Sequence, residues 1–311
     1  MKILLTSRAG GRCAALAITV AAIALVGNSV HSLPAGPNAT ALRRHHLPIQ
    51  IHRRRDQTVS ESDNWSGYAV TGSTGSVTDV KASWVIPSVA STCENTPNGY
   101  AAFWTGIDGW TSNTVEQIGT DSDCVNLAGT KNATPTSYAW FEFYPQDAYL
   151  IGNYSRSGAC ELDCVAPGDT ISAEVKFSGT AATGFRFRGA SLFTVTIKDE
   201  TQGWTFTTSS TVPGAKQSSA EWIAETPYGC DTSSGFCNLS DFGSVDYGES
   251  LTSIPNTSYA TVAGVTKPLG SFGSSIQEAV MVSYSGDETM AQPSPLEDGT
   301  SFTDTWENQG P

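Results

Sequence analysis

The chain has four histidines in 311 residues, and none of them follows His52. A body without histidine excludes a Ser–His–Asp or Cys–His nucleophile and any zinc site built from imidazoles. A phosphate-cradling glycine loop is also missing, as is any long apolar run beyond the N-terminus. Basic residues are scarce, since the part from Ser60 onward has 9 Lys and Arg against 29 Asp and Glu. Such an acidic body repels nucleic acid, so carboxylates, amides and tyrosines remain as catalytic groups.

The N-terminus has the pattern of a secretory signal. Three bases, Lys2, Arg8 and Arg12, precede an apolar run at 13–26 that is too short to span a bilayer. We assign residues 1–32 to this signal peptide. The mature protein is therefore expected to be secreted and extracellular, without a membrane partner.

A basic segment follows, with the sequence "ALRRHHLPIQIHRRRDQ", and Asp56 is the one acid before residue 60. Its charge is opposite to that of the body, which suggests a detachable or regulatory piece. We interpret residues 33–59 as a basic propeptide and residues 60–311 as the functional domain. A disordered basic arm is the alternative. We expect the domain to act as a monomer.

Six cysteines follow the signal, and an even number in an exported chain favours disulfides over metal ligands. Pairing by proximity gives 93–124, 160–164 and 230–237, although the sequence leaves other connectivities open. No metal ion or cofactor is expected.

Short alternating runs separated by turn residues recur through the body, as in "VTDVKASWVIP" and "SLFTVTIKDE". With no convincing amphipathic helix among them, they predict an all-β fold, an antiparallel β-sandwich.

The stretch "SSAEWIAETP" is a predicted strand with two carboxylates on one face. If Ala220, Trp222 and Ala224 point into a core, Glu221 and Glu225 point the other way together with Ile223. The two acids are then about 13 Å apart, at about 3.3 Å per residue, which is too far for a glycosidase pair. Only one of them should do chemistry, unless Glu142 from another strand completes a pair.

Two further segments combine polar groups with aromatics. In "SYAWFEFYP", Tyr138, Trp140 and Glu142 share one face, whereas Ala139, Phe141 and Phe143 form a plain core face. In "AFWTGIDGW", Trp104 and Asp108 alternate in phase, and "NTVEQIGTD" carries Gln117 just before a glycine. Together these faces indicate a groove for an extended polymer, either a peptide or a sugar. A solvated outer face is the alternative.

Four ordered motifs resemble the glutamic peptidase family, the eqolisins: "WTGIDG", "EQIGTD", "YAWFEFYP" and "AEWIAE". The resemblance covers nearly all of the chain after residue 60. It implies a sandwich similar to concanavalin A-like lectins and glucanases, and an acid-acting endopeptidase with Gln117 and Glu225 as the catalytic pair. The substrate-binding residues that it implies are Trp104, Asp108, Asp121, Trp140 and Glu142. Tyr138 is placed with them, although the family has an acid near this position.

The residue chemistry is consistent with this resemblance. A carboxylate at Glu225 can take a proton from water and return it to the leaving amine. Gln117 offers N–H donors that do not titrate, so it can stabilise an oxyanion in acid. We further expect residues 43–55 to lie across the acidic groove until acid weakens their ion pairs. The other candidates are a secreted carbohydrate-active enzyme that uses Glu142 with Glu225, and a lectin-like binder.

Overall fold

The computed structural model describes residues 30–32, 42, 44–125, 133–155, 159–181 and 190–311. Most of the predicted signal peptide and part of the basic segment therefore lie outside the described residues. Regular structure in the described part is nearly all strand, together with one α-helical turn, α1 (Glu249–Thr252), and two 3₁₀ turns, η1 (Leu269–Ser271) and η2 (Gly273–Ser275). No helix within these ranges is long and apolar enough to cross a membrane.

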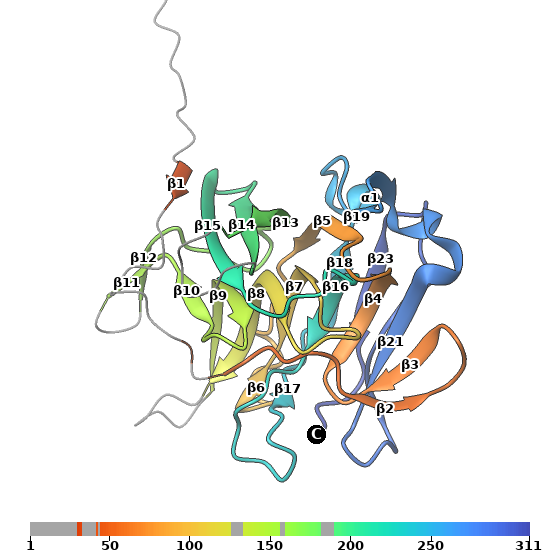
Figure 1. Cartoon of the computed structure of the whole chain (residues 1–311). Helices are drawn as coiled ribbons and strands as arrows, with labels where there is room; N and C mark the ends of the chain where they lie inside the picture. Colours follow the sequence, from red (N-terminus) through yellow and green to blue (C-terminus); the bar gives the residue numbers. More distant parts are fainter. Residues whose placement is uncertain (1–29, 33–41, 43, 126–132, 156–158, 182–189) are drawn as a thin grey trace, which may run out of the picture.

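The strand with the two carboxylates, β16 (Ser219–Glu225), lies inside a layer in which every neighbour pairs antiparallel (Figure 1). The order across this first layer is β21 (Ile276–Val282), β4 (Trp65–Thr71), β16, β7 (Ala102–Ile107), β8 (Val115–Val125), β9 (Thr134–Tyr144) and β10 (Tyr149–Ile151).

A second layer packs on one face of the first, with β5, β13 and β14 against β7 and β8. Its order is β20 (Val265–Pro268), β19 (Tyr259–Val262), β5 (Val77–Val85), β13 (Thr170–Thr180), β14 (Ser191–Asp199), β15 (Trp204–Val212) and β1 (Val30–Ser32), with β1 parallel to β15. The predicted all-β, antiparallel sandwich is confirmed.

One side of the sandwich is closed by strands that link the two layers. From β21 the pairing continues through β22 (Thr289–Pro293), β23 (Phe302–Trp306) and β18 (Ser244–Tyr247) to β5. At the same edge β3 (Val59–Ser62) pairs parallel with β21, and β2 (Ile51–Arg54) pairs antiparallel with β3. Part of the basic segment is thus built into the sheet.

Alternation along the strands sorts their side chains into two clusters. Ala220, Trp222 and Ala224 lie in the core between the layers, as predicted, and so do Phe141 and Phe143. The opposite face of the first layer carries a second buried cluster that includes four tryptophans: Trp65, Trp104, Trp110 and Trp140. This outer face is buried only because other parts of the chain cover it.

The cysteines form the three bridges between nearest neighbours, 93–124, 160–164 and 230–237. Short strand pairs lie beside them: β6 (Gly99–Tyr100) with β17 (Asn238–Leu239), and β11 (Asn153–Tyr154) with β12 (Cys160–Leu162). The 93–124 bridge is part of the buried core, since both of its cysteines belong to the cluster between the layers.

Candidate active site

Gln117 and Glu142 face each other on neighbouring strands, β8 and β9, on the outer face of the first layer. Both side chains are fully buried. Gln117 Nε2 lies 3.2 Å from Glu142 Oε2 and donates a hydrogen bond to it. Glu142 thus accepts one N–H of the Gln117 carboxamide. The second N–H of Gln117 can donate to another acceptor.

Glu225 ends β16 on the same face, and its carboxyl is fully buried. Trp104 Nε1 donates to Oε2 at 2.8 Å, and Asn64 Nδ2 donates to Oε1 at 3.3 Å. Trp104 can lie flat along the sheet because Gly106 and Gly119 flank it. A Cβ at these positions would come within 2.9 Å of Trp104 Cζ3 and 2.6 Å of Trp104 Cβ. The two glycines thus make room for the indole that orients Glu225.

Tyr138 lies between two acids on β8. Its hydroxyl is 2.7 Å from Asp121 Oδ2 and 2.8 Å from Asp123 Oδ2, and it has only one proton to donate at a time. Burial and the neighbouring charge of Asp121 raise the pKa of Asp123 to about 8. Asp123 is therefore protonated in acid, and its proton can complete the hydrogen bonding of this trio. Near this position the family to which the sequence motifs point has an acid. Here Tyr138 instead bridges Asp121 and Asp123 and adds no third carboxyl.

Residues 44–50 run across this face of the first layer (Figure 1). Their contacts with Glu142 and Glu225 place them over the acids. Backbone bonds fix the segment at both ends, since His45 exchanges N–H and C=O bonds with Tyr228 and the N–H of Ile49 donates to the carbonyl of Gly109. The N–H of Gln50 also donates to Asn64 Oδ1 at 2.8 Å. Gln117 and Glu225 are therefore covered by the chain itself.

The middle of the segment contacts both members of the predicted pair. Gln117 Nε2 donates to the carbonyl oxygen of His46 at 2.8 Å, and the N–H of Leu47 donates to Glu225 Oε1 at 3.1 Å. The carbonyl oxygen of Leu47 accepts from Trp65 Nε1 at 3.0 Å. Two side chains from separate strands thus converge on one peptide unit.

The basic side chains of the segment pair with the acids of the groove. The His46 imidazole is buried, stacks on Trp140 at 3.6 Å between ring centroids, and lies 3.2 Å from Glu142 and 3.6 Å from Asp121. Burial lowers its pKa, but the hydrogen bonds of these two acids and the charge of Asp121 outweigh burial and raise the pKa to about 10. Arg44 lies 3.1 Å from Asp123.

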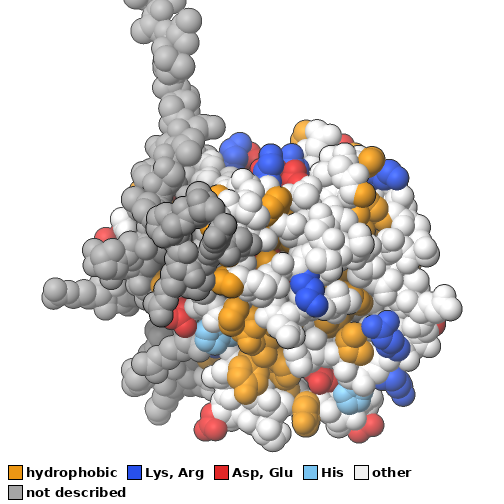
Figure 2. Space-filling model, viewed as in Figure 1, with side chains coloured by type: hydrophobic (Ala, Val, Ile, Leu, Met, Phe, Trp, Pro, Cys, Tyr) orange, Lys and Arg blue, Asp and Glu red, His pale blue; other side chains and the backbone are white. Residues whose placement is uncertain are grey.

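His45 adds a further charge pair, with Nδ1 2.9 Å from Glu142 Oε1. Its hydrogen bond to Glu142 raises its pKa above the ordinary histidine value. Seen in space filling from the same side, histidine reaches the surface at two places on this face, with hydrophobic side chains gathered between them (Figure 2). His45 and His52 are partly exposed, whereas His46 lies beneath.

Covering the groove changes the acidity of Glu225. Burial raises its pKa to about 8, opposed by the charge of His46 and assisted by that of Glu142. In this covered state the carboxyl is protonated throughout the acid range.

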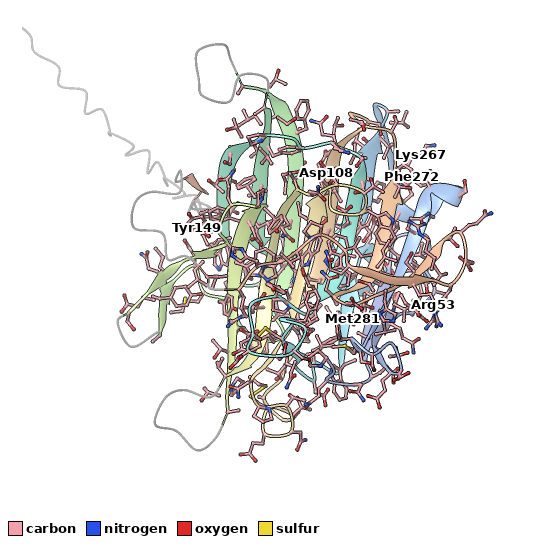
Figure 3. The ribbon with its side chains drawn as sticks, turned by 60° about the horizontal axis from the view of Figure 1, so that its bottom comes forward. Arg53, Asp108, Tyr149, Lys267, Phe272 and Met281 are labelled. Atoms are coloured by element: carbon pink, nitrogen blue, oxygen red, sulfur yellow. A yellow bond between two sulfur atoms is a disulfide. The ribbon has the colours of Figure 1, made fainter. Side chains whose placement is uncertain are left out.

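Asp108 lies elsewhere, in the loop that follows β7 at one end of the strands (Figure 3). Its φ of 71° ends the alternation that would put its side chain beside Trp104. Its carboxylate accepts from the backbone N–H groups of 216–218, at 2.6 to 2.9 Å, and from the Ser218 hydroxyl. These bonds hold the start of β16, so Asp108 is not brought together with Gln117 and Glu225.

Two other glutamates of the sequence motifs, Glu116 and Glu221, are fully buried near Asp108. Burial, together with the charge of Asp108, raises the pKa of both well above the ordinary value. They lie on strands β8 and β16, next to the candidate pair in sequence but outside the contacts described above. Glu225, and not Glu221, is the acid of β16 that contacts the His46–Leu47 peptide unit, to which Gln117 also donates.

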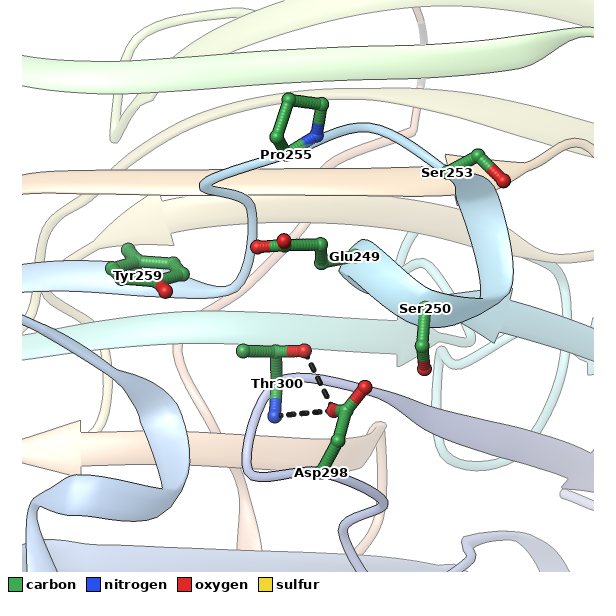
Figure 4. A pocket seen from close by; sticks show the side chains of 7 residues that line it. All are labelled: Glu249, Ser250, Ser253, Pro255, Tyr259, Asp298 and Thr300. Atoms are coloured by element: carbon green, nitrogen blue, oxygen red, sulfur yellow. Dashed lines mark hydrogen bonds between the residues drawn. The ribbon is translucent and has the colours of Figure 1, made fainter.

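An open pocket of about 500 Å³ lies away from this site, between α1 and the 298–300 turn (Figure 4). Glu249 and Asp298 line it, and Asp298 accepts hydrogen bonds from the N–H and hydroxyl of Thr300. In the described part of the chain, no group of three or more His, Cys, Asp and Glu residues is arranged to hold a metal ion.

Sequence reasoning assigned no role to Asn64, Trp65 and Asp123, which the structure places in the groove. Asn64 and Trp65 stand in "DNWSGY", just before and at the start of β4, and both contact the backbone of Leu47. Asp123 continues the alternation of Gln117 and Asp121 along β8, and this period of two is the signal that could have found it.

Comparison with known proteins supplies the family. The model of the peptidase A4 family matches residues 63–283. The chain belongs to this family, the eqolisins. Its fold is similar to a crystal structure of scytalido-glutamic peptidase with a transition state analog inhibitor, at a TM-score of 0.56 and 19% identity, covering 79% of this chain and 98% of that one.

A second similar structure is SCP-B, an eqolisin in complex with the tripeptide Ala-Ile-His. The TM-score is 0.53 at 20% identity, with 79% of this chain and 98% of that chain covered. Comparison with curated protein sequences gives no match.

Proposed function

We propose that this eqolisin is an acid-acting endopeptidase in which Glu225 activates water and Gln117 stabilises the oxyanion. The observation that carries the proposal is the convergence of the two side chains on a single peptide unit, at His46 O and Leu47 N. A carboxamide at the carbonyl oxygen and a carboxyl at the nitrogen are the contacts that amide hydrolysis requires.

The mechanism needs no histidine. Ionised Glu225 takes a proton from water as the water oxygen bonds to the carbonyl carbon, and the developing negative charge lies on the oxygen held by Gln117 Nε2. The protonated carboxyl then gives its proton to the leaving nitrogen as the C–N bond breaks. Since the amide of Gln117 does not titrate, the oxyanion site is available in acid, where an imidazole base would be charged.

Substrate is expected to bind along the same face, as an extended strand over β7, β8 and β9. Trp104 and Trp140 provide apolar walls, while Asp121, Tyr138 and Glu142 offer acceptors on the side that residues 44–46 occupy. The eqolisin SCP-B binds a tripeptide, which supports a groove of this size. For Asp108 we propose a positioning role through the start of β16.

Protein hydrolysis under acid conditions tests the proposal. We expect the mature chain to digest casein at about pH 3 to 5, near the ordinary pKa of a glutamate, and to do so in the presence of pepstatin. Release of glycan fragments without proteolysis would instead favour the carbohydrate-active alternative, and binding without turnover would favour a lectin-like module.

We also propose that the chain is secreted as a precursor in which the basic segment is a propeptide. The contacts of Arg44, His45 and His46 with acids of the groove support this, because they bury the catalytic pair. In the covered groove burial favours the protonated form of Glu225, and residues 46 and 47 occupy the catalytic pair, so the precursor is held inactive toward other proteins.

A synthetic peptide of residues 40–56 should inhibit the mature enzyme near neutral pH and low salt. The raised pKa of His46 means that its contribution to docking is complete below about 6.5 and is lost as pH rises through about 10. Salt also weakens docking, because it screens the exposed ion pairs. The measurement is a residual activity titration from pH 3 to 8.

The matched control is the same peptide with Arg44, His45 and His46 replaced by alanine. It should inhibit at least about tenfold more weakly, since it lacks the partners of the buried acids. Equal inhibition by the two peptides would show that charge does not dock the segment.

A further inference from the structure

The peptide bond between His46 and Leu47 lies across the catalytic pair in the orientation of a substrate. Its carbonyl oxygen is 2.8 Å from Gln117 Nε2, and its nitrogen is 3.1 Å from Glu225 Oε1. The neighbouring bonds of the segment lack this double contact, because Glu142 takes the N–H of His46 and Trp65 takes the carbonyl of Leu47. One bond is therefore singled out.

From this geometry we propose that the precursor cuts itself between His46 and Leu47. The inference rests on the proposed peptidase function and names the chain's own substrate bond. Water supplies its oxygen to the carbonyl carbon of His46, and Glu225 takes one of its protons. The C–N bond then breaks, and this proton moves to the nitrogen of Leu47. The products are a carboxyl terminus at His46 and an amino terminus at Leu47.

The side chains before this bond fit three acidic subsites. Arg44 lies against Asp123, His45 against Glu142 Oε1, and His46 between Glu142 Oε2 and Trp140. Burial of the His46 imidazole between an indole and carboxylates makes this the most specific of the three positions. The same groups should favour other substrates with a cationic, planar residue before the cut bond.

On the other side of the bond the backbone is fixed without help from side-chain charge. Asn64 Nδ2 donates to the carbonyls of Leu47 and Pro48, and Asn64 Oδ1 accepts from the N–H of Gln50. The chain then enters β2, which pairs with β3. The register of the bond is thus set from both directions.

Cleavage would release one side of the segment and keep the other. Residues after Leu47 stay attached through β2. The piece that ends at His46 loses its covalent link and is then held by the groove, by backbone bonds of Leu42 and His45, and by the pairing of β1 with β15. Its new carboxylate would lie beside Glu142 and Glu225 in a buried site, and like charges repel there. Departure of this piece opens the groove to water.

The covered groove also determines the expected rate of self-cleavage. Water must enter between Glu225 and the carbonyl carbon of His46, and its entry reduces the burial that keeps Glu225 protonated. Self-cleavage should therefore be slower than turnover of an added substrate by the mature enzyme.

The test follows the purified precursor, prepared at neutral pH with residues 42–50 intact, after transfer to about pH 4. Intact mass and N-terminal sequencing should reveal a new start at Leu47 and a fragment that ends at His46. The first-order rate should not change over a hundredfold range of protein concentration, since the bond lies in its own chain's groove.

Three variants sharpen the result. Glu225→Gln should leave the bond intact, and His46→Ala should slow the cut at least about tenfold. The matched control is His52→Ala, whose histidine pairs with Asp63 outside the groove, and it should be cut at the wild-type rate.

Casein digestion measured in parallel separates the two ideas. A wild-type chain that digests casein but starts at another residue, or keeps the 46–47 bond, overturns the self-cleavage inference alone. A chain from which the residues up to His46 have been removed, and which still fails to digest casein at acid pH, overturns the proposed function.

Discussion

Replacing Glu225 by glutamine should reduce kcat/KM for protein hydrolysis at acid pH by about 10³-fold. Glutamine keeps the shape of the side chain and can still contact Trp104 Nε1, but it neither takes a proton from water nor returns one to the leaving amine. The loss should appear in kcat, because substrate contacts along β8 and β9 are unchanged. Steady-state kinetics on a fluorogenic peptide measure it.

The matched control is Glu221→Gln, the same change on the same strand and the same face. Glu221 is also fully buried, and burial raises its pKa well above the ordinary value, so it is a neutral acid near pH 4. A neutral amide of similar size should keep kcat within about threefold of the wild type. If the two variants lost activity equally, Glu225 would contribute to the stability of the fold and not to the chemical step.

Gln117→Ala should lower kcat by about 10² to 10³-fold, the usual cost of removing one oxyanion donor. KM should change little, because the hydrogen bond to the carbonyl oxygen strengthens mainly as charge develops on it. The variant also leaves Glu142 without one of its donors, so thermal melting must accompany the kinetics.

Gln277→Ala is the control for this second change. Gln277 is likewise nearly buried in the first layer, but its amide bonds only to its neighbour's carbonyl at Ile276 in the described structure. It should retain kcat. A Gln117→Ala enzyme with wild-type kcat and unchanged melting would remove the amide from the mechanism.

Much of the fold follows from alternation that is visible in the sequence. The small–large–small set of Ala220, Trp222 and Ala224 identifies the core face of β16, and Phe141 with Phe143 does the same for β9. The opposite faces then have to carry Glu225 and Glu142. Period-two patterning is decisive here because both faces are buried, and it places Glu225 and Glu142 on the outer face, among the tryptophans.

The rest depends on contacts that no local pattern encodes. Asp108 leaves the face of Trp104 because its backbone adopts φ of 71°, which alternation alone does not reveal. The choice between Glu221 and Glu225 depends on which one Trp104 Nε1 reaches, and Gly106 and Gly119 set the position of that indole. The register of His46 and Leu47 over the groove comes from Asn64 and from pairing far along the chain.

The buried acids also make the folding stability of the protein depend on pH. Burial raises the pKa of Glu116, Glu221 and Asp304, the last to about 8. The stability that these acids contribute is complete below about pH 4 and is lost as the pH rises through their raised pKa values. A molecule that moves from an acidic to a neutral medium therefore loses folding stability. This loss would restrict its activity to acidic surroundings.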